Sequence, residues 1–148
     1  MSELTDLYRE VILDHNRQPR NFGALDPADR VVNGVNPLCG DKLTLYIKLD
    51  GDRISDIRFQ GTGCAISVAS SSLMTERVKG SSIGDALELY ESVHGMLTGE
   101  SDEAPERLGK LAALAGVREF PSRVKCASLG WHALKAGLSG KDDEISTE

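Results

Sequence analysis

Hydrophobic and polar residues alternate in the first half of the chain, which is the pattern of a strand with one buried face. Leucine and isoleucine occupy every second position of the 43–49 segment, and the residues between them are polar or aromatic. The Asp50-Gly51 pair predicts a hairpin turn, and the 54–59 segment supplies the return strand. A shorter strand opens at Val31 and is expected to end over the 34–37 segment, where Gly34 and Pro37 interrupt it. This pattern predicts a small three-stranded antiparallel sheet.

Elsewhere apolar residues recur every three or four positions, which is the spacing of helices. Five segments have this spacing, at about 4–15, 65–79, 83–90, 108–114 and 124–138. The second is rich in small and apolar residues, so we expect it to be buried against the sheet. The acidic segment 98–105 reads as an exposed loop, and the polar residues 139–148 as a frayed tail.

These elements predict an α+β fold, in which a small three-stranded antiparallel sheet packs against about five helices, with a metal site at one end. The 148 residues suit a single domain spanning positions 1–148. No internal repeat or linker divides them.

Charge and composition narrow the function. The net charge is −6, with no local run of Lys and Arg, which argues against a nucleic-acid partner. No stretch approaches the roughly 20 apolar residues of a membrane span. The polar, acidic N-terminus does not resemble a secretory signal, so we expect a cytoplasmic protein. Thiols stay reduced in that compartment, and three cysteines fit a disulfide framework poorly.

The three cysteines share one local setting, a loop or the junction of a loop with a helix. Cys64 follows Gly61-Thr-Gly63, Cys126 follows the cationic residues of Arg123-Val-Lys125, and Cys39 precedes Gly40 and Asp41. The positive end of a helix dipole favours the thiolate form, and we expect Cys64 and Cys126 to benefit from it.

Cys39, Asp41, Cys64 and Cys126 together offer three sulfurs and one carboxylate, a full tetrahedral shell for zinc. Iron–sulfur clusters also accept thiolate ligands. A buried cysteine is often only an apolar filler, and the intervals between these cysteines match no zinc-finger template. The recurrence of glycine beside them, with Asp41 in step, favours one shared site.

The motifs Asn36-Pro-Leu-Cys-Gly-Asp41, Gly61-Thr-Gly-Cys-Ala-Ile-Ser67 and Arg123-Val-Lys-Cys-Ala127 resemble those of the IscU/NifU N-terminal family of iron–sulfur cluster assembly proteins. The resemblance extends over nearly the whole chain, including Pro19-Arg-Asn-Phe-Gly23. Within the family the chain is most similar to the SufU branch. Lys125 stands where IscU proteins have a histidine before the third cysteine, and a stretch of about twenty additional residues near 96–116 precedes that cysteine.

The resemblance implies that zinc is bound at Cys39, Asp41, Cys64 and Cys126. It also implies that the protein is a zinc-dependent sulfurtransferase, which accepts persulfide sulfur from a SufS-type cysteine desulfurase and stimulates it. In this family mechanism a histidine of the desulfurase replaces the Cys39 thiolate on zinc, and Cys39 then attacks the persulfide. Arg123, beside Cys126, is a candidate to support Asp41 or the persulfide.

Two other functions remain open. The same ligands suit a scaffold on which a [2Fe–2S] cluster is built and passed to downstream cluster assembly proteins. Alternatively, zinc acts only to stabilise the fold.

Other polar residues are not expected to be metal ligands or nucleophiles. His15, His94 and His132 are each expected to be surface or partner-facing residues rather than ligands. Ser70-Ser71-Ser72 is expected to serve close helix packing, since no histidine or carboxylate is patterned beside it.

Overall fold

The computed structural model describes residues 3–37, 40–98, 108, 111, 114, 116–117, 120–139 and 145–146, without the side chains of 3–8, 121, 145 and 146. The elements in chain order are α1 (Glu3–Arg17), β1 (Arg30–Asn36), β2 (Asp41–Asp50), β3 (Arg53–Thr62), α2 (Ala65–Val78), α3 (Ile83–Thr98), α4 (Pro121–Leu138) and β4 (Ile145–Ser146).

Three strands form the antiparallel sheet that the alternating pattern predicts. Strand β2 lies between β1 and β3, and the β2–β3 hairpin turns at Gly51, whose φ of 63° is costly for residues with a side chain. The two-residue strand β4 adds to the free edge of β1 in parallel. Ile145 and Ser146, within the segment for which the sequence predicts a frayed tail, pair with Gly34 and Val35.

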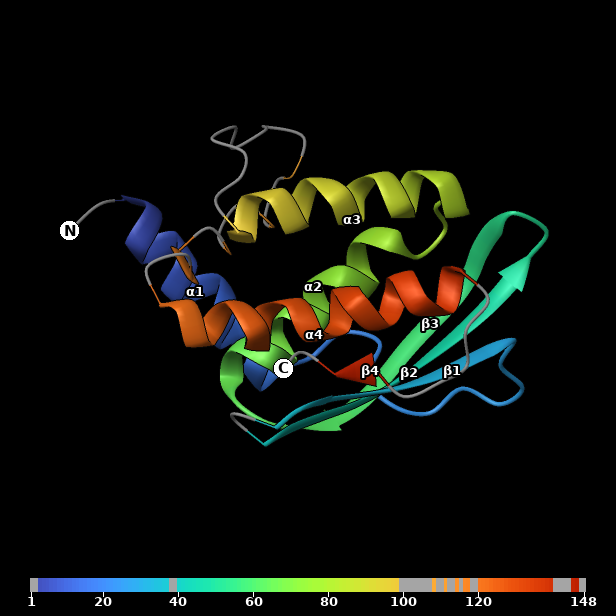
Figure 1. Cartoon of the computed structure of the whole chain (residues 1–148), viewed down its shortest axis with the longest axis horizontal. Helices are drawn as coiled ribbons and strands as arrows, with labels where there is room; N and C mark the ends of the chain where they lie inside the picture. The colour runs from blue at the N-terminus through green and yellow to red at the C-terminus, as the bar shows by residue number, and fades with distance from the viewer. Residues whose placement is uncertain are drawn as a thin grey trace.

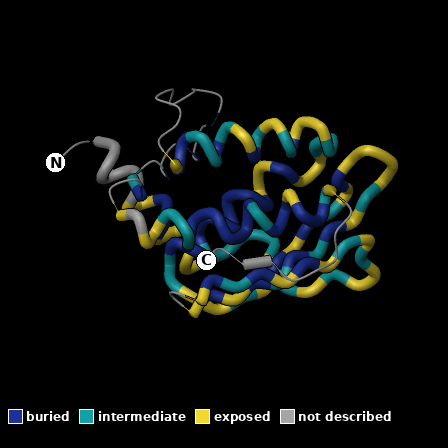
Figure 2. The backbone as a smooth tube through the Cα atoms, viewed as in Figure 1, coloured by how far each residue is buried: buried dark blue, intermediate teal, exposed yellow. Residues whose placement is uncertain are grey.

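The helices cover one face of this sheet (Figure 1). Helices α2 and α4 pack on the sheet and on each other, α1 packs on α2, and α3 lies on α4, farther from the sheet. Figure 2 shows the buried residues concentrated in α2, in α4 and in parts of the strands that they cover. The α+β prediction is confirmed. The fourth predicted helix, at about 108–114, falls mostly outside the described residues, although Leu108, Leu111 and Leu114 are buried in the core.

Small residues let α2 and α4 approach closely. Ser70 Oγ donates a hydrogen bond of 2.6 Å to the Ala127 carbonyl and accepts one of 3.2 Å from Trp131 Nε1. Gly130 faces Ser71 at a point where a Cβ atom would collide with the serine hydroxyl. The serine run therefore serves helix packing, as expected, and it fixes the position of α4 next to Cys126.

His15 is a correction to the expectation of surface histidines. Its side chain is fully buried between α1 and α2, and its Nδ1 lies 2.7 Å from Ser72 Oγ. The backbone N–H of Arg20 also donates to that hydroxyl, at 2.8 Å. A buried imidazole is tolerated because the serine supplies a polar partner.

The interface of α3 and α4 holds the other two histidines. Tyr90 stacks on His94, its hydroxyl lies 3.1 Å from His132 Nδ1, and the two imidazole centroids are 5.6 Å apart. Lys135 lies over the Tyr90 ring. Burial lowers the pKa of His132 below its ordinary value, and the nearby His94 and Lys135 lower it further.

No helix in the described part of the chain is long and apolar enough to cross a membrane.

This interface predicts a loss of stability in mild acid. The folded state holds His132 neutral, so the unfolded chain takes up the proton first as pH falls below about 6.5. The contribution of neutral His132 to the free energy of unfolding is fully present above that pH and is lost progressively below it. We expect the melting temperature to fall between pH 7.5 and pH 5.5, and to fall less in His132→Gln. Equal acid sensitivity of the two proteins, measured by thermal denaturation, would contradict this assignment.

Candidate metal centre

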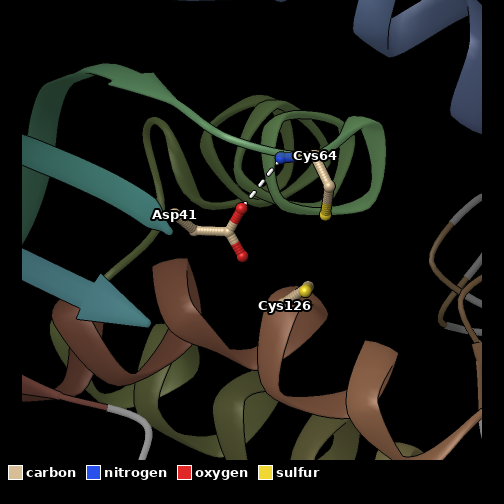
Figure 3. Close-up of side chains that lie close together, drawn as sticks. All are labelled: Asp41, Cys64 and Cys126. Atoms are coloured by element: carbon tan, nitrogen blue, oxygen red, sulfur yellow. Dashed lines mark hydrogen bonds between the residues drawn. The ribbon is translucent and has the colours of Figure 1, made fainter. Parts of the chain in front are cut away.

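Three elements converge at one end of the molecule and bring together an aspartate and two cysteines (Figure 3). Asp41 begins β2, Cys64 is the N-cap residue of α2, and Cys126 lies in the second turn of α4. One ligand atom of each, the carboxylate oxygen or the sulfur, lies within 4.8 Å of the other two. These residues are 23 to 85 positions apart in the sequence, so the fold alone assembles them.

The sheet register accounts for the first pair. Lys42 pairs with Thr62, so the beginning of β2 lies beside the end of β3, where the chain turns into α2. The backbone N–H of Cys64 donates a 2.8 Å hydrogen bond to Asp41 Oδ1, drawn in Figure 3. Asp41 therefore supplies an acceptor to the N-cap residue of α2, where no side-chain cap is present.

Gly63 makes this approach possible. A Cβ atom at this position would overlap the Asp41 carboxylate. The glycine thus does more than permit a turn, because it leaves the space that the carboxylate occupies beside the Cys64 N–H.

Cys126 differs from the sequence-based expectation in its helical setting. It is fully buried, and its sulfur lies 3.7 Å from the Ser122 carbonyl oxygen one turn earlier in α4. The helix-dipole argument applies within the first turn, so it fits Cys64, the N-cap residue, better than Cys126. Cys64 is half-buried, and it is the most accessible of the three residues.

The other predicted site residues are less informative. Cys39 lies outside the described residues, so its place in the shell stays a prediction. The backbone N–H of Gly40 donates a 2.9 Å hydrogen bond to the Asn36 carbonyl oxygen. Arg123 is exposed near the start of α4, and the ion pairs found among the described residues do not join it to Asp41.

The sequence analysis missed Asn36 as a member of this site. Its side chain is fully buried, and its Nδ2 lies 3.1 Å from Asp41 Oδ2 and 3.5 Å from Cys126 Sγ. The available signal was an amide residue at an inward-facing strand position. The sequence pattern instead predicts that the strand ends over 34–37, so it does not predict an inward-facing side chain at Asn36.

The donor set fits a zinc ion. In a tetrahedral shell with bonds of about 2.3 Å to sulfur and 2.0–2.2 Å to oxygen, neighbouring ligand atoms are about 3.6–3.8 Å apart. The three ligand atoms all lie within 4.8 Å of one another, so they would have to approach by only about 1 Å to reach that spacing. Two thiols and a carboxylate would also leave one position for a further ligand.

Comparisons with known proteins find relatives that match most of this chain. The model of the NifU-like N terminal domain family matches residues 7–127. The zinc-dependent sulfurtransferase SufU of Bacillus subtilis (strain 168) is 44% identical over 141 residues, which are 95% of each chain. The iron–sulfur cluster assembly scaffold protein IscU of Streptococcus pyogenes serotype M1 is also 44% identical, over 93% of this chain and 86% of that protein.

A crystal structure has the same fold. FiSufU of Fervidobacterium islandicum AW-1, described as an iron–sulfur cluster assembly scaffold protein for the SUF system, superposes with a TM-score of 0.83 at 36% identity. The match covers 90% of this chain and 97% of the other.

The Gly63 contact yields a prediction about metal binding. In Gly63→Ala the new methyl group displaces the Asp41 carboxylate, and we expect zinc affinity to fall by about 10–100-fold. Chelator competition measures this change. Gly84→Ala is the matched control, because a Cβ atom there meets no neighbour, and its zinc affinity should be unchanged. Zinc affinity retained in Gly63→Ala would show that the carboxylate position is not needed.

Proposed function

This chain belongs to the NifU-like N-terminal domain family, which includes SufU and IscU proteins of iron–sulfur cluster assembly, and from that premise we propose that it is a zinc-dependent sulfurtransferase. It accepts persulfide sulfur from a SufS-type cysteine desulfurase and stimulates that enzyme. The sulfur then passes to downstream cluster assembly proteins.

The mutual spacing of Asp41, Cys64 and Cys126 is the observation that carries this proposal. Ligand atoms that all lie within 4.8 Å of one another suit a single ion. A [2Fe–2S] cluster divides its four protein ligands between two iron atoms, so its ligand set is more widely spread. The spacing therefore favours zinc, which Asp41, Cys64 and Cys126 would hold together with Cys39.

Cys39 is the proposed sulfur acceptor. Its thiolate attacks the outer sulfur of the persulfide on the desulfurase cysteine. A new sulfur–sulfur bond forms on Cys39, the bond to the desulfurase sulfur breaks, and the desulfurase cysteine leaves as a thiolate. Bound zinc would favour the deprotonated form of the cysteines that hold it.

The residues around Cys39 in this proposal have two roles, which are to hold the zinc ligands in place and to attract the negatively charged persulfide. Asp41 and Cys126 are fully buried and held by hydrogen bonds, so they keep their positions during transfer. Arg123 is exposed near the start of α4, where its guanidinium is available to the negative charge of an arriving persulfide. Lys125 adds a second cation next to Cys126.

A second candidate is the scaffold function, in which a [2Fe–2S] cluster is built on this chain. The specific observation in its favour is that the Streptococcus IscU scaffold protein and the Bacillus SufU sulfurtransferase have the same 44% identity to this chain. Overall sequence similarity therefore does not distinguish the sulfurtransferase from the scaffold, and only the chemistry of the site can.

Metal analysis of the purified protein separates the two functions. We expect one zinc per chain when no iron is added, and strong stimulation of a SufS-type desulfurase in a turnover assay. Bound iron with labile sulfide and little stimulation would instead support the scaffold. The assay should include a desulfurase-only reaction, because stimulation is measured relative to it.

Cys39→Ser tests the acceptor assignment. We expect the variant to fold and to lose desulfurase stimulation, because a hydroxyl does not accept the persulfide sulfur. Mass spectrometry after alkylation should find an added sulfur atom on Cys39 of the unmodified chain. Cys64→Ser is the comparison variant, since a ligand-only role predicts reduced zinc content. Full stimulation by Cys39→Ser would remove Cys39 from the acceptor role.

A further inference from the structure

Asn36 occupies a position where the strand pattern calls for an apolar residue. It is the last residue of β1, and the alternation along that strand turns Val32, Gly34 and Asn36 toward the helices. Asn36 pairs in register with Asp41 across the turn. Burying an amide at such a position is unfavourable unless its polar atoms find partners, so the partners of this amide carry information.

Both hydrogens of the Asn36 amide nitrogen have an acceptor at the metal centre. One acceptor is Asp41 Oδ2 at 3.1 Å, and the other is Cys126 Sγ at 3.5 Å, within the longer range of hydrogen bonds to sulfur. The opposite orientation of the amide would place its oxygen against a carboxylate oxygen and a sulfur, which is repulsive. The acceptors therefore fix which end of the amide faces the site.

This arrangement leaves both carboxylate oxygens of Asp41 engaged. Cys64 N–H holds Oδ1, and Asn36 holds Oδ2. The same amide reaches the sulfur of Cys126 on α4, so one side chain connects two of the three grouped ligands and two different elements. Partners of this kind orient metal ligands before the ion arrives.

We propose that Asn36 is a positioning residue of this centre, which sets the affinity for zinc and the rate of zinc release by holding Asp41 and Cys126 in place. The inference deepens the proposed function, because it rests on the assignment of these residues as zinc ligands. It assigns Asn36 no contact with zinc or with the persulfide. The oxygen of its amide has no hydrogen-bond partner among the described residues, so the nitrogen carries the contacts that define the role.

Zinc and cobalt binding by the full chain test this role. We expect Asn36→Ala to bind zinc about tenfold or more weakly in chelator competition, and to release it faster. Cobalt in place of zinc should give an altered ligand-field spectrum, since the carboxylate is no longer oriented. Asn36→Ser keeps one hydroxyl donor, and it should fall between Asn36→Ala and the unmodified chain.

Asn33→Ala is the matched control. Asn33 lies on the same strand, but it is exposed and accepts its hydrogen bond from Thr44 Oγ1. Its removal should change neither zinc affinity nor the cobalt spectrum. A loss caused only by weakening of β1 would affect both asparagine variants.

The combination with Asp41→Ala identifies the route of the effect. If Asn36 acts largely through Asp41, then Asn36→Ala should weaken zinc binding less in an Asp41→Ala background than in the unmodified chain. An equal effect in both backgrounds would support the same role exerted through Cys126 instead of Asp41. Wild-type zinc affinity and an unchanged cobalt spectrum in Asn36→Ala would overturn the proposal. None of these measurements uses the desulfurase, so they can fail while sulfur transfer is confirmed, and the reverse also holds.

Discussion

The buried carboxylate of Asp41 is the constraint on which the metal centre depends. Removing a carboxylate from water costs several kcal/mol, and the cost is tolerated only where hydrogen-bond donors or a cation compensate it. Here the Cys64 N–H and the Asn36 amide engage the two oxygens. These contacts fix the register at the end of the sheet, the start of α2 and the space that Gly63 must leave open. A cation placed among Asp41, Cys64 and Cys126 would complete the compensation.

The three grouped ligands are unequally accessible, which matters for a site that exchanges sulfur. Asp41 and Cys126 have no solvent exposure, whereas Cys64 is partly exposed. Among these three residues, Cys64 is therefore the one that solvent or a partner can reach. Asp41 and Cys126 form the buried side of the centre. The hydrogen bonds of Ser70 to Ala127 and Trp131 hold α4 against α2. This close packing of the two helices restrains Cys126 on the buried side of the centre.

The sequence was most informative where a residue's role depends on its neighbours in the chain. Alternation over 43–49 predicted β2 because side-chain period and strand geometry are linked, and the setting of Asp41, Cys64 and Cys126 predicted three residues that the fold groups. It failed where the deciding partner is remote. His15 is buried because Ser72, 57 residues away, offers a hydroxyl. Asn36 contacts Asp41, five residues away, but its second contact depends on α4, which brings Cys126 to it across 90 residues. No local pattern contains either contact.

The position of Asn36 matters because this site contains a carboxylate, unlike a zinc site made of four thiolates. A fourth thiolate in place of Asp41 would bind zinc more firmly, and it would not need amide donors to compensate a buried carboxylate. The carboxylate is the weaker ligand, and its strength depends on how well its oxygens are oriented. In the proposed role of Asn36, one amide between the carboxylate and a thiol would make the metal affinity adjustable through a residue that does not contact the ion. The Bacillus SufU and the Streptococcus IscU have the same identity to this chain, so overall similarity does not separate the two functions, and the chemistry of the site has to.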